Sequence, residues 1–304
     1  MFALTQLTRF TGQKSHPRPP FILKPSLTME YLVVAGGGAG GAHQAGGGGG
    51  GGLVYNTNHA LLFDVVYTIS VGAGGPMVSS GLGYNGTDST FGTITAKGGG
   101  GGGYYQGGAS GSGGSSGGQG DNINGTTSLG TANQTLQAGD SGTYGFGNAG
   151  GAAPSHPSAP HGAGGGGGAG AAGNPPPTQA TSGTGGAGKA VSITGSSVYY
   201  AGGGGGASSN SAAGGLGGGG QGNDAYQSYA TQGTDLLGGG GGANAHQTGA
   251  PYGSGRGGNG IVILAFPSYG NTVRILSGTY TTGNRPGFSV YSFSTSGSLL
   301  IQNG

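Results

Sequence analysis

The chain has 304 residues, of which 85 are glycine and none is cysteine, so neither disulfides nor cysteine-based zinc sites support its fold. Charged residues make up only 5% of the chain, against about 25% in an ordinary soluble domain. Disordered soluble chains usually keep themselves solvated with charge, so this composition predicts a packed body with a surface of Ser, Thr, Asn, Gln and Tyr. No apolar run approaches the ~20 residues of a membrane span, and no membrane segment is expected.

The first 28 residues carry basic side chains and prolines but no acidic residue. We expect residues 1–28 to form an extended arm that attaches the protein to a partner; a frayed terminus is the simpler alternative. The arm lacks the uninterrupted apolar core of a signal peptide, and its four basic residues make a poor nucleic-acid site. The basic residues expected to make the attachment are Arg9, Lys14, Arg18 and Lys24.

The stretch YLVVAGGGAGG, residues 31–41, contains the dinucleotide-binding pattern G-x-G-x-x-G at Gly36, Gly38 and Gly41. At this glycine content about six such matches arise by chance, so the pattern carries little information. A dinucleotide site also needs a helix after its last glycine. The seven glycines of residues 46–52 cannot hold one, because each costs about 1 kcal/mol relative to alanine. We therefore expect no nucleotide cofactor.

Other chemical motifs fail in similar ways. The stretch GTGGAGKA, residues 183–190, nearly spells a phosphate-binding loop, but Ala190 replaces the Ser or Thr that would hold magnesium. A G-x-S-x-G match at residues 113–117 lies in a Gly/Ser tract without a strand, turn and helix around it. The six histidines show no metal-ligand spacing, and no two carboxylates are neighbours in sequence. We expect neither an enzyme nor a metal site.

Two kinds of segment alternate along the chain, and neither has helical periodicity. Short glycine runs recur, for example at residues 98–103 and 202–206. Between them lie polar turns and apolar segments rich in Val, Ile, Tyr, Phe and Thr, which are typical of β-strands. The predicted strand segments are YLVVA (31–35), LLFDVVYTISV (61–71), STFGTITAK (89–97), AVSITGSSVYY (190–200) and GIVILAF (260–266).

Flexible linkers are the usual interpretation of such glycine runs. These runs are instead short, numerous and bracketed by strand-forming residues, so we expect them to be structural. Polyglycine can form a left-handed helix with three residues per turn and no internal hydrogen bonds. Without side chains, such rods can lie side by side and bond through their backbones. The predicted fold class is all-β and irregular: a lattice of polyglycine-II helices with β-strands at its ends and no α-helix of note.

This lattice is demanding, because ordering glycine costs about 0.5–1 kcal/mol more per residue than ordering alanine. A paired backbone group returns only about 1 kcal/mol, so nearly every interior N–H and C=O must be bonded. Replacing an inward glycine such as Gly100 or Gly204 with Val or Asp should therefore damage the fold far more than changing Asn122. We divide the chain into the arm (1–28), the glycine-rich domain (29–266) and a C-terminal β module (267–304).

Five stretches in this order resemble a glycine-rich domain of bacteriophage virion proteins, mostly tail fibres, fibre-tip adhesins and related surface proteins. They are YLVVAGGGAGG, VVYTISVGAGG, STFGTITAKGGGGGG, VYYAGGGGG and GNGIVILAFP, and the tail GFSVYSFSTSGSLLI (287–301) resembles the β module that follows such domains. The likeness covers residues 30–302. It implies that loops at one lattice end touch the host surface, while an N-terminal arm attaches the protein to the particle. The chain lacks extended shaft repeats, which favours a short fibre, a tip or a surface knob.

We therefore expect a non-enzymatic tail-fibre or adhesin subunit, a homotrimer, made in the host cytoplasm and displayed on the virion surface. Its partners would be other virion proteins and a host-surface glycan or protein. Two alternatives stay open: a capsid decoration or tail structural protein without receptor contact, and a cellular matrix or receptor-ectodomain protein. The polar and aromatic loop residues expected to contact the receptor are Tyr84, Asn85, Tyr104, Tyr105, Gln106, Tyr144, Phe146, Tyr226, Tyr229, His246 and Tyr252. Any of these tyrosines could instead pack over the lattice ends.

Overall fold

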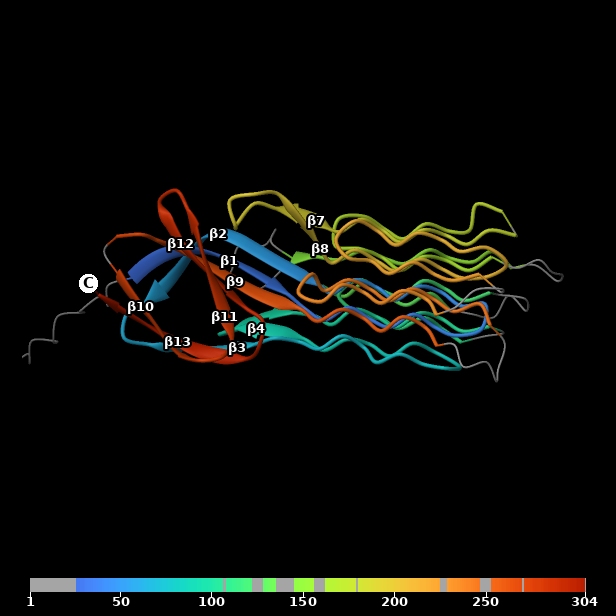
Figure 1. The fold of residues 1–304 in the computed structure, drawn as a ribbon, viewed down its shortest axis with the longest axis horizontal. Coiled ribbons are helices and arrows are strands. Elements are labelled where there is room, and N and C mark those ends of the chain that lie inside the picture. The colour runs from blue at the N-terminus through green and yellow to red at the C-terminus, as the bar shows by residue number, and fades with distance from the viewer. Residues whose placement is uncertain are drawn as a thin grey trace, which may run out of the picture.

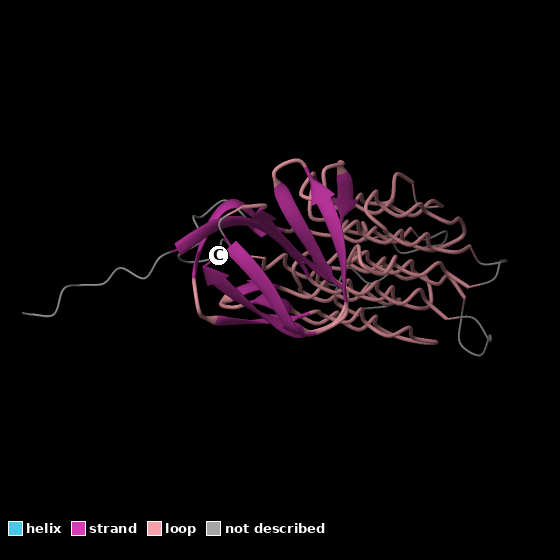
Figure 2. Ribbon diagram, turned by 60° about the vertical axis from the view of Figure 1, so that its left-hand side comes forward, coloured by secondary structure: helices cyan, strands magenta, loops and turns pink. Residues whose placement is uncertain are grey.

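The molecule is elongated, with β-strands at one end and nearly parallel extended segments at the other (Figure 1). We call these parts the sheet end and the glycine lattice. No α-helix occurs among the residues described, which confirms the all-β prediction (Figure 2). The computed structural model describes residues 26–105, 108–121, 128–134, 145–155, 162–178, 180–224, 229–246, 253–269 and 271–303.

The strands form two larger sheets and one hairpin, and every pairing is antiparallel. The six-stranded sheet runs β11 (Tyr280–Arg285), β12 (Phe288–Phe293), β9 (Ile261–Pro267), β1 (Ser26–Val34), β2 (Leu53–Leu62) and β6 (Gly145–Phe146). The five-stranded sheet runs β10 (Asn271–Ser277), β13 (Gly297–Asn303), β3 (Val66–Ser70), β4 (Ser89–Phe91) and β5 (Ile94–Ala96), and the hairpin is β7 (Lys189–Val191) with β8 (Val198–Tyr200).

Apolar burial is concentrated at the sheet end. Tyr31 and Val33 of β1 belong to a core cluster that also holds Phe91 of β4 and Leu299 of β13. The alternate residues of β1 belong to a second cluster, which includes the β7–β8 hairpin through Val191, Ile193 and Tyr200. Because β1 is buried on both faces, its sequence reads as a continuous apolar run.

Three of the predicted strand segments are hairpins or turns between strands. The segment 61–71 is divided by Asp64, whose φ of +57° reverses the chain between β2 and β3. The two strands lie in different sheets, so this single apolar stretch contributes to both. Segments 89–97 and 190–200 divide in the same way, into β4 with β5 and β7 with β8.

The glycine lattice consists of extended backbone segments that bond to one another through main-chain groups. Residues 46–52 lie at its centre and are fully buried. Successive amides donate to three different neighbouring segments, and every fourth amide returns to the first neighbour, which is the three-residue period of a polyglycine-II helix. The bonds are Gly46 to Gly103, Gly47 to Gly164, Gly48 to Gly241, Gly49 to Gly100, Gly50 to Gly167 and Gly51 to Gly238, at 2.8–3.1 Å.

The carbonyls of the same run accept bonds from three further segments, which pass through Gly41, Gly118 and Gly204. Residues 46–52 therefore have six bonded neighbours. No side chain can enter such a contact: a Cβ added at Gly204 would lie 2.0 Å from the carbonyl oxygen of Gly241, and one at Gly100 would lie 2.0 Å from that of Gly111. The predicted lattice is confirmed, and glycine is required in it because backbones approach each other directly.

Outer segments need glycine only where they face inward. In the stretch GLGYNGTD, residues 81–88, Gly83 and Gly86 face the lattice, and a Cβ on either would lie 2.2 Å from a backbone oxygen. The residues between them are exposed. A glycine at every third position is thus enough to dock a rod on the outside of the lattice.

Polar side chains bond the amides that have no neighbouring rod. Thr87 Oγ1 accepts the N–H of Ala73 at 2.8 Å, and Asp88 Oδ1 accepts that of Gly98 at 2.8 Å. These side chains accept hydrogen bonds from backbone N–H groups at the rim of the lattice. Without them, these N–H groups would be partly buried and would have no partner.

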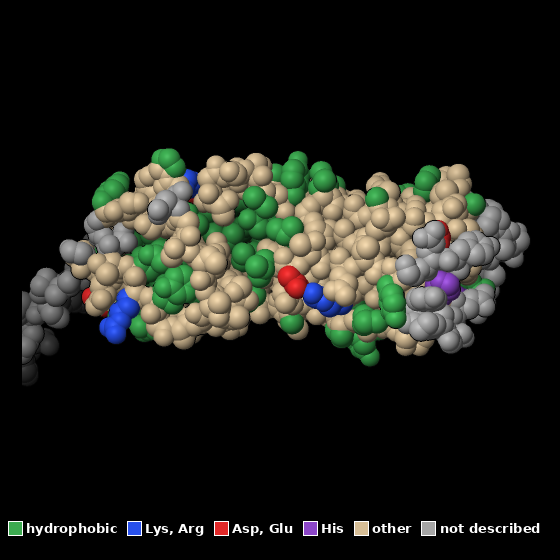
Figure 3. Space-filling model, in the orientation of Figure 1, with side chains coloured by type: hydrophobic (Ala, Val, Ile, Leu, Met, Phe, Trp, Pro, Cys, Tyr) green, Lys and Arg blue, Asp and Glu red, His purple; other side chains and the backbone are tan. Residues whose placement is uncertain are grey.

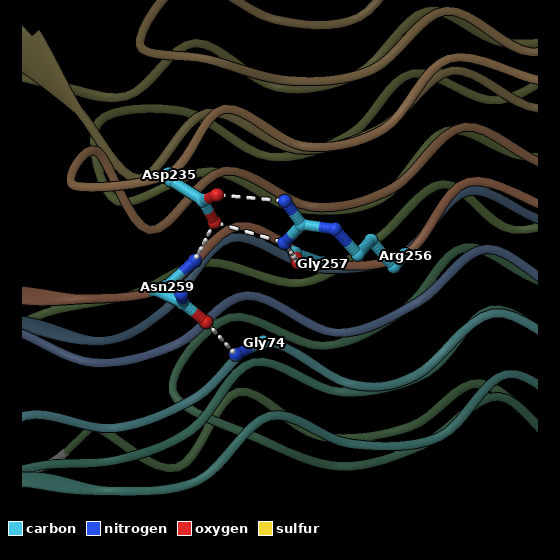
Figure 4. A network of polar contacts seen from close by, with 5 residues as sticks. All are labelled: Gly74, Asp235, Arg256, Gly257 and Asn259. Atoms are coloured by element: carbon cyan, nitrogen blue, oxygen red, sulfur yellow. Dashed lines mark hydrogen bonds and ion pairs between the residues drawn. The ribbon is translucent and has the colours of Figure 1, made fainter.

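One rim network joins three segments near the sheets (Figure 4). Asp235 accepts two hydrogen bonds from Arg256, at 2.8 and 2.7 Å, and a third from the Asn259 backbone at 2.8 Å. The Asn259 side chain in turn accepts the N–H of Gly74 at 3.0 Å. The bonds from Arg256 are the main reason that the pKa of the Asp235 carboxyl is lowered.

Residues 267–303 share both large sheets with the glycine-rich domain. Strand β12 pairs with β9, and β13 pairs with β3. Arg285 of β11 also holds the largely buried Glu30 of β1, with contacts of 2.5 and 3.0 Å. The strands expected to form a C-terminal module therefore belong to the same two sheets from which the lattice segments extend.

We predict that Gly204→Ala destabilises the protein by about 1–3 kcal/mol or more, because the new Cβ collides with a backbone oxygen that cannot move alone. Gly283→Ala in β11 is the control, since the nearest atom to its Cβ would lie 3.9 Å away. Denaturant unfolding measures both. Equal stability of the two variants would contradict the lattice packing.

We predict slow hydrogen exchange for the amides of residues 46–52, comparable with that of β1, because each amide is buried and bonded to another segment. Exchange monitored by mass spectrometry on peptides covering this run provides the measurement. Complete exchange within seconds would show that the run is a flexible linker.

We predict that acid weakens the Asp235 network. The folded pKa of Asp235 is lowered, so its contribution to stability is present above the ordinary pKa of an aspartate and is lost as the pH falls below about 4. Both partners are more than one third exposed, so solvent screening limits the effect to about 1 kcal/mol. Unfolding of the wild type and of Asp235→Asn, compared at pH 7 and pH 3, should show the difference between them shrinking in acid.

Candidate functional site at the loop end

The strands define two opposite ends of the lattice. Residues 35–42 leave the end of β1 and residues 46–52 return to the start of β2, so the turn between them lies far from the sheets (Figure 1). Other segments turn at the same place, and Ala42 bridges both Gly81 and Asn244 there. We call this region the loop end. Its described residues include 42–45, 78–81, 104–105, 108, 119–121, 153, 180, 207–211, 221–224, 229–231 and 243–246.

Both ends of the described chain lie at the sheet end. Strand β1 begins at Ser26 and runs toward the lattice, while β13 runs away from it to Asn303, which pairs with Asn271. The expected attachment residues Arg9, Lys14, Arg18 and Lys24 lie outside the described residues. The chain thus enters its fold at the end opposite to the loops.

An aromatic cluster occupies the first turn of the loop end. The ring centroid of His43 lies 4.5 Å from that of Tyr105 and 5.8 Å from that of Tyr104. Both imidazole nitrogens of His43 are buried without a hydrogen-bond partner, and this burial lowers the pKa of the ring. Burial therefore favours the neutral form of the His43 ring. The structure thus brings the predicted residues Tyr104 and Tyr105 together at the loop end.

The backbone of this turn is unusual. His43 and Gln44 have φ values of +77° and +46°, a region that residues with a Cβ rarely adopt. Such conformations persist where the surrounding structure enforces them, and they often accompany functional sites.

Tyr229 and His246 lie on neighbouring segments of the loop end. Tyr229 is 56% exposed and lines a polar cup of about 180 Å³. His246 is half-buried, and its backbone N–H donates to Asn244 Oδ1 at 2.7 Å. Asn223 connects the two segments, because its side chain accepts the N–H of Ala245 at 2.7 Å. These two predicted residues therefore share one region of the surface.

Tyr84 and Asn85 lie on the flank of the lattice, away from the loop end. They belong to the outer segment 81–88, and the Tyr84 carbonyl accepts the N–H of Ala39 in the middle of the neighbouring rod. Asn85 has a structural role, since its Oδ1 accepts the N–H of Gly101 at 2.8 Å. Tyr84 is 60% exposed and lines one shallow surface with Pro76 and Leu82, which we call the apolar flank. Figure 3 shows hydrophobic side chains at the lower edge of the molecule, over the segments that Figure 1 draws in cyan.

Phe146 lies at the opposite side of the lattice from the loop end. It belongs to β6, which pairs with the start of β2, and it packs against the second core cluster. The ammonium of Lys189 lies 4.5 Å from its ring centroid, a cation–π contact. Phe146 thus packs at the junction of sheets and lattice. The remaining predicted residues, Gln106, Tyr144, Tyr226 and Tyr252, lie outside the described residues.

Sequence reasoning missed several residues of the loop end. His43 was considered only among the six histidines, which show no metal-ligand spacing, and the cup residues Gln221, Asp224 and Thr231 were not among the predicted contact residues. Their common signal is position: each lies within a few residues of the point where a glycine segment ends.

Within the described ranges, no group of three His, Asp or Glu side chains is placed to hold a metal ion. The same ranges contain no helix that is long and apolar enough to cross a membrane. The charged pairs Lys97–Asp88 and Arg256–Asp235 lie toward the sheets.

Comparison with known proteins covers both the lattice and the loops that join its segments. A family model described as a glycine-rich domain matches residues 22–267, which is most of the chain. No curated protein and no solved structure matches it. The matched range begins just before β1 and ends with the last residue of β9, so it contains every segment of the lattice. The chain belongs to the glycine-rich domain family.

Proposed function

We propose that this chain is a non-enzymatic bacteriophage virion protein, a tail-fibre or adhesin subunit that contacts a host-surface receptor through its loop end. The proposal includes display on the virion surface, attachment through the N-terminal arm and assembly as a homotrimer. It rests on the resemblance of the five ordered motifs to virion proteins and on membership in the glycine-rich domain family.

The observation that carries the proposal is the separation of the two ends. The described chain begins at the sheet end with Ser26, so residues 26–28 of the expected arm belong to β1, whereas the loops gather at the far end of a rigid lattice. An adhesin needs this arrangement, because attachment to the particle and contact with the cell must occur at opposite ends. The lattice supplies stiffness, since each central rod is bonded to its neighbours at every residue.

The loop end also has suitable side chains. His43, Tyr104, Tyr105, Tyr229 and His246 place aromatic rings there, and amide and hydroxyl groups surround them. Tyrosine with small polar residues gives large contact area and adaptable hydrogen bonds at low entropic cost, as in antibody binding sites. Tyr84 and Phe146 are left out of the proposed contact surface because of their places on the flank and at the junction.

We predict that the labelled protein binds a subset of a panel of bacterial strains and competes with phage for them. The double variant Tyr105→Ser/Tyr229→Ser should lower cell binding about tenfold or more, because aromatic anchors dominate such contacts. Tyr269→Ser is the matched control, since Tyr269 is 79% exposed in the turn between β9 and β10 at the opposite end. Flow cytometry with a C-terminal fluorescent label measures the binding.

Failure of the wild-type protein to bind any strain or to compete with phage would remove the receptor-binding function. The alternative is then a capsid decoration or tail structural protein, and copy number per particle tests it. Tens to hundreds of copies on the shell indicate decoration, while a small multiple of three or six at the tail indicates a fibre.

A further inference from the structure

We propose that the polar cup at the loop end is a binding subsite for one ring of an uncharged sugar. This inference rests on the proposed function, because it names the ligand class that one part of the receptor contact takes. The cup is lined by Ser211, Gln221, Gly222, Asn223, Asp224, Tyr229 and Thr231.

The lining combines the two kinds of group that a sugar requires. A pyranose presents hydroxyl groups around its edge and apolar C–H groups on its faces. Ser211 and Gln221 can both donate to and accept from the sugar hydroxyls beyond the bond that joins them, and the Asp224 carboxylate can accept. Tyr229 offers an aromatic face that stays more than half exposed, against which the C–H groups can pack.

The volume of the cup selects a small ligand. Drug-sized ligands occupy pockets of about 300–1,000 Å³, whereas this cup holds about 180 Å³. It would take a single ring, with the rest of a longer glycan extending over the neighbouring surface of the loop end.

Charge at this end of the molecule disfavours anionic ligands. Asp224 is the charged residue of the lining, and the buried Asp121 also lies at the loop end. The described lysines and arginines all lie toward the sheets or within them: Lys97 and Arg256 in ion pairs with Asp88 and Asp235, Lys189 over Phe146, and Arg274 and Arg285 in β10 and β11. On the face that Figure 3 shows, no described Lys or Arg side chain lies at the loop end. A phosphate or a carboxylate in the cup would lie close to the Asp224 carboxylate, which repels it.

The walls of the cup are fixed before any ligand arrives. The Thr231 hydroxyl accepts the N–H of Gln221 and donates to its carbonyl, and the Gln221 side chain donates to Ser211 Oγ at 3.3 Å. Asn223 is 6% exposed, and its amide nitrogen donates to Asn244 Oδ1 at 3.3 Å. Binding therefore costs little ordering of the protein, which favours recognition of a ligand with few atoms.

Saturation-transfer NMR on the full chain tests the inference. The probes are the methyl glycosides of glucose, galactose, mannose and N-acetylglucosamine, with glucose 6-phosphate and N-acetylneuraminic acid as anionic comparisons. We expect at least one uncharged glycoside to bind more tightly than both anionic sugars. Tyr229→Ala should weaken it about tenfold, as loss of a stacking ring does elsewhere. Tyr229→Phe, which keeps the ring, and Tyr84→Ala on the flank should bind as the wild type does.

Three results would overturn the inference: no binding of any uncharged glycoside, tighter binding of an anionic sugar, or binding that survives Tyr229→Ala. The cell-binding assay separates this inference from the proposed function. If Tyr229→Ala loses the sugar but binds cells as the wild type does, the receptor contact lies elsewhere. The cup then binds sugar but is no part of the receptor contact, which overturns its role in the receptor contact and leaves the proposed adhesin function standing.

Discussion

The structure depends on hydrogen bonds between backbones that have no side chains between them. In residues 46–52, each amide donates to one of three neighbouring segments, and carbonyls of the run accept from three others. A polyglycine-II helix turns once in three residues, so its polar groups point outward in directions that match a hexagonal arrangement of rods. Apolar burial plays the larger part only at the sheet end, where β1 and β9 lie between two clusters of buried side chains. The strands fix the rods at the sheet end, and backbone hydrogen bonds between the rods stabilise the lattice.

The rods at the rim of the lattice have no neighbouring rod on their outer side, and their sequences are more varied than those of the central rods. Outer segments such as 81–88 keep glycine at every third residue and use the other positions for surface side chains. Thr87 and Asp88 then bond to amides that lack a neighbouring rod. The Asp235–Arg256–Asn259 network does the same between three segments (Figure 4). Stability at the centre thus comes from the absence of side chains, and at the rim from their hydrogen bonds.

Much of this architecture follows from the sequence, but the positions of the loops do not. Glycine runs bracketed by strand residues predict the lattice, and the close contacts at Gly100 and Gly204 agree with that expectation. Whether a turn lies at the loop end or at the junction depends on how many rods precede it. Residues 109–121 form two rods that are joined at Ser115, but the sequence shows no obvious break between them. The number of rods before Phe146 therefore cannot be counted from the sequence, and Phe146, expected in a contact loop, lies at the junction of sheets and lattice. Tyr84 and Asn85 resemble a polar loop because a rim rod needs so few glycines. Because the sequence does not fix where each turn lies, only some of the predicted contact residues lie together at the loop end.

The three-residue period constrains how such a protein can change its length. One residue inserted into the run at residues 46–52 would rotate every later amide by about 120°, away from the neighbour to which it now donates. Three inserted residues would restore the direction but displace the run by one turn, about 9 Å, past six neighbours that had not grown. Insertions and deletions are therefore tolerated only beyond the ends of the rods. Evolution can therefore lengthen or replace the turns at the loop end while the rods of the lattice keep their length.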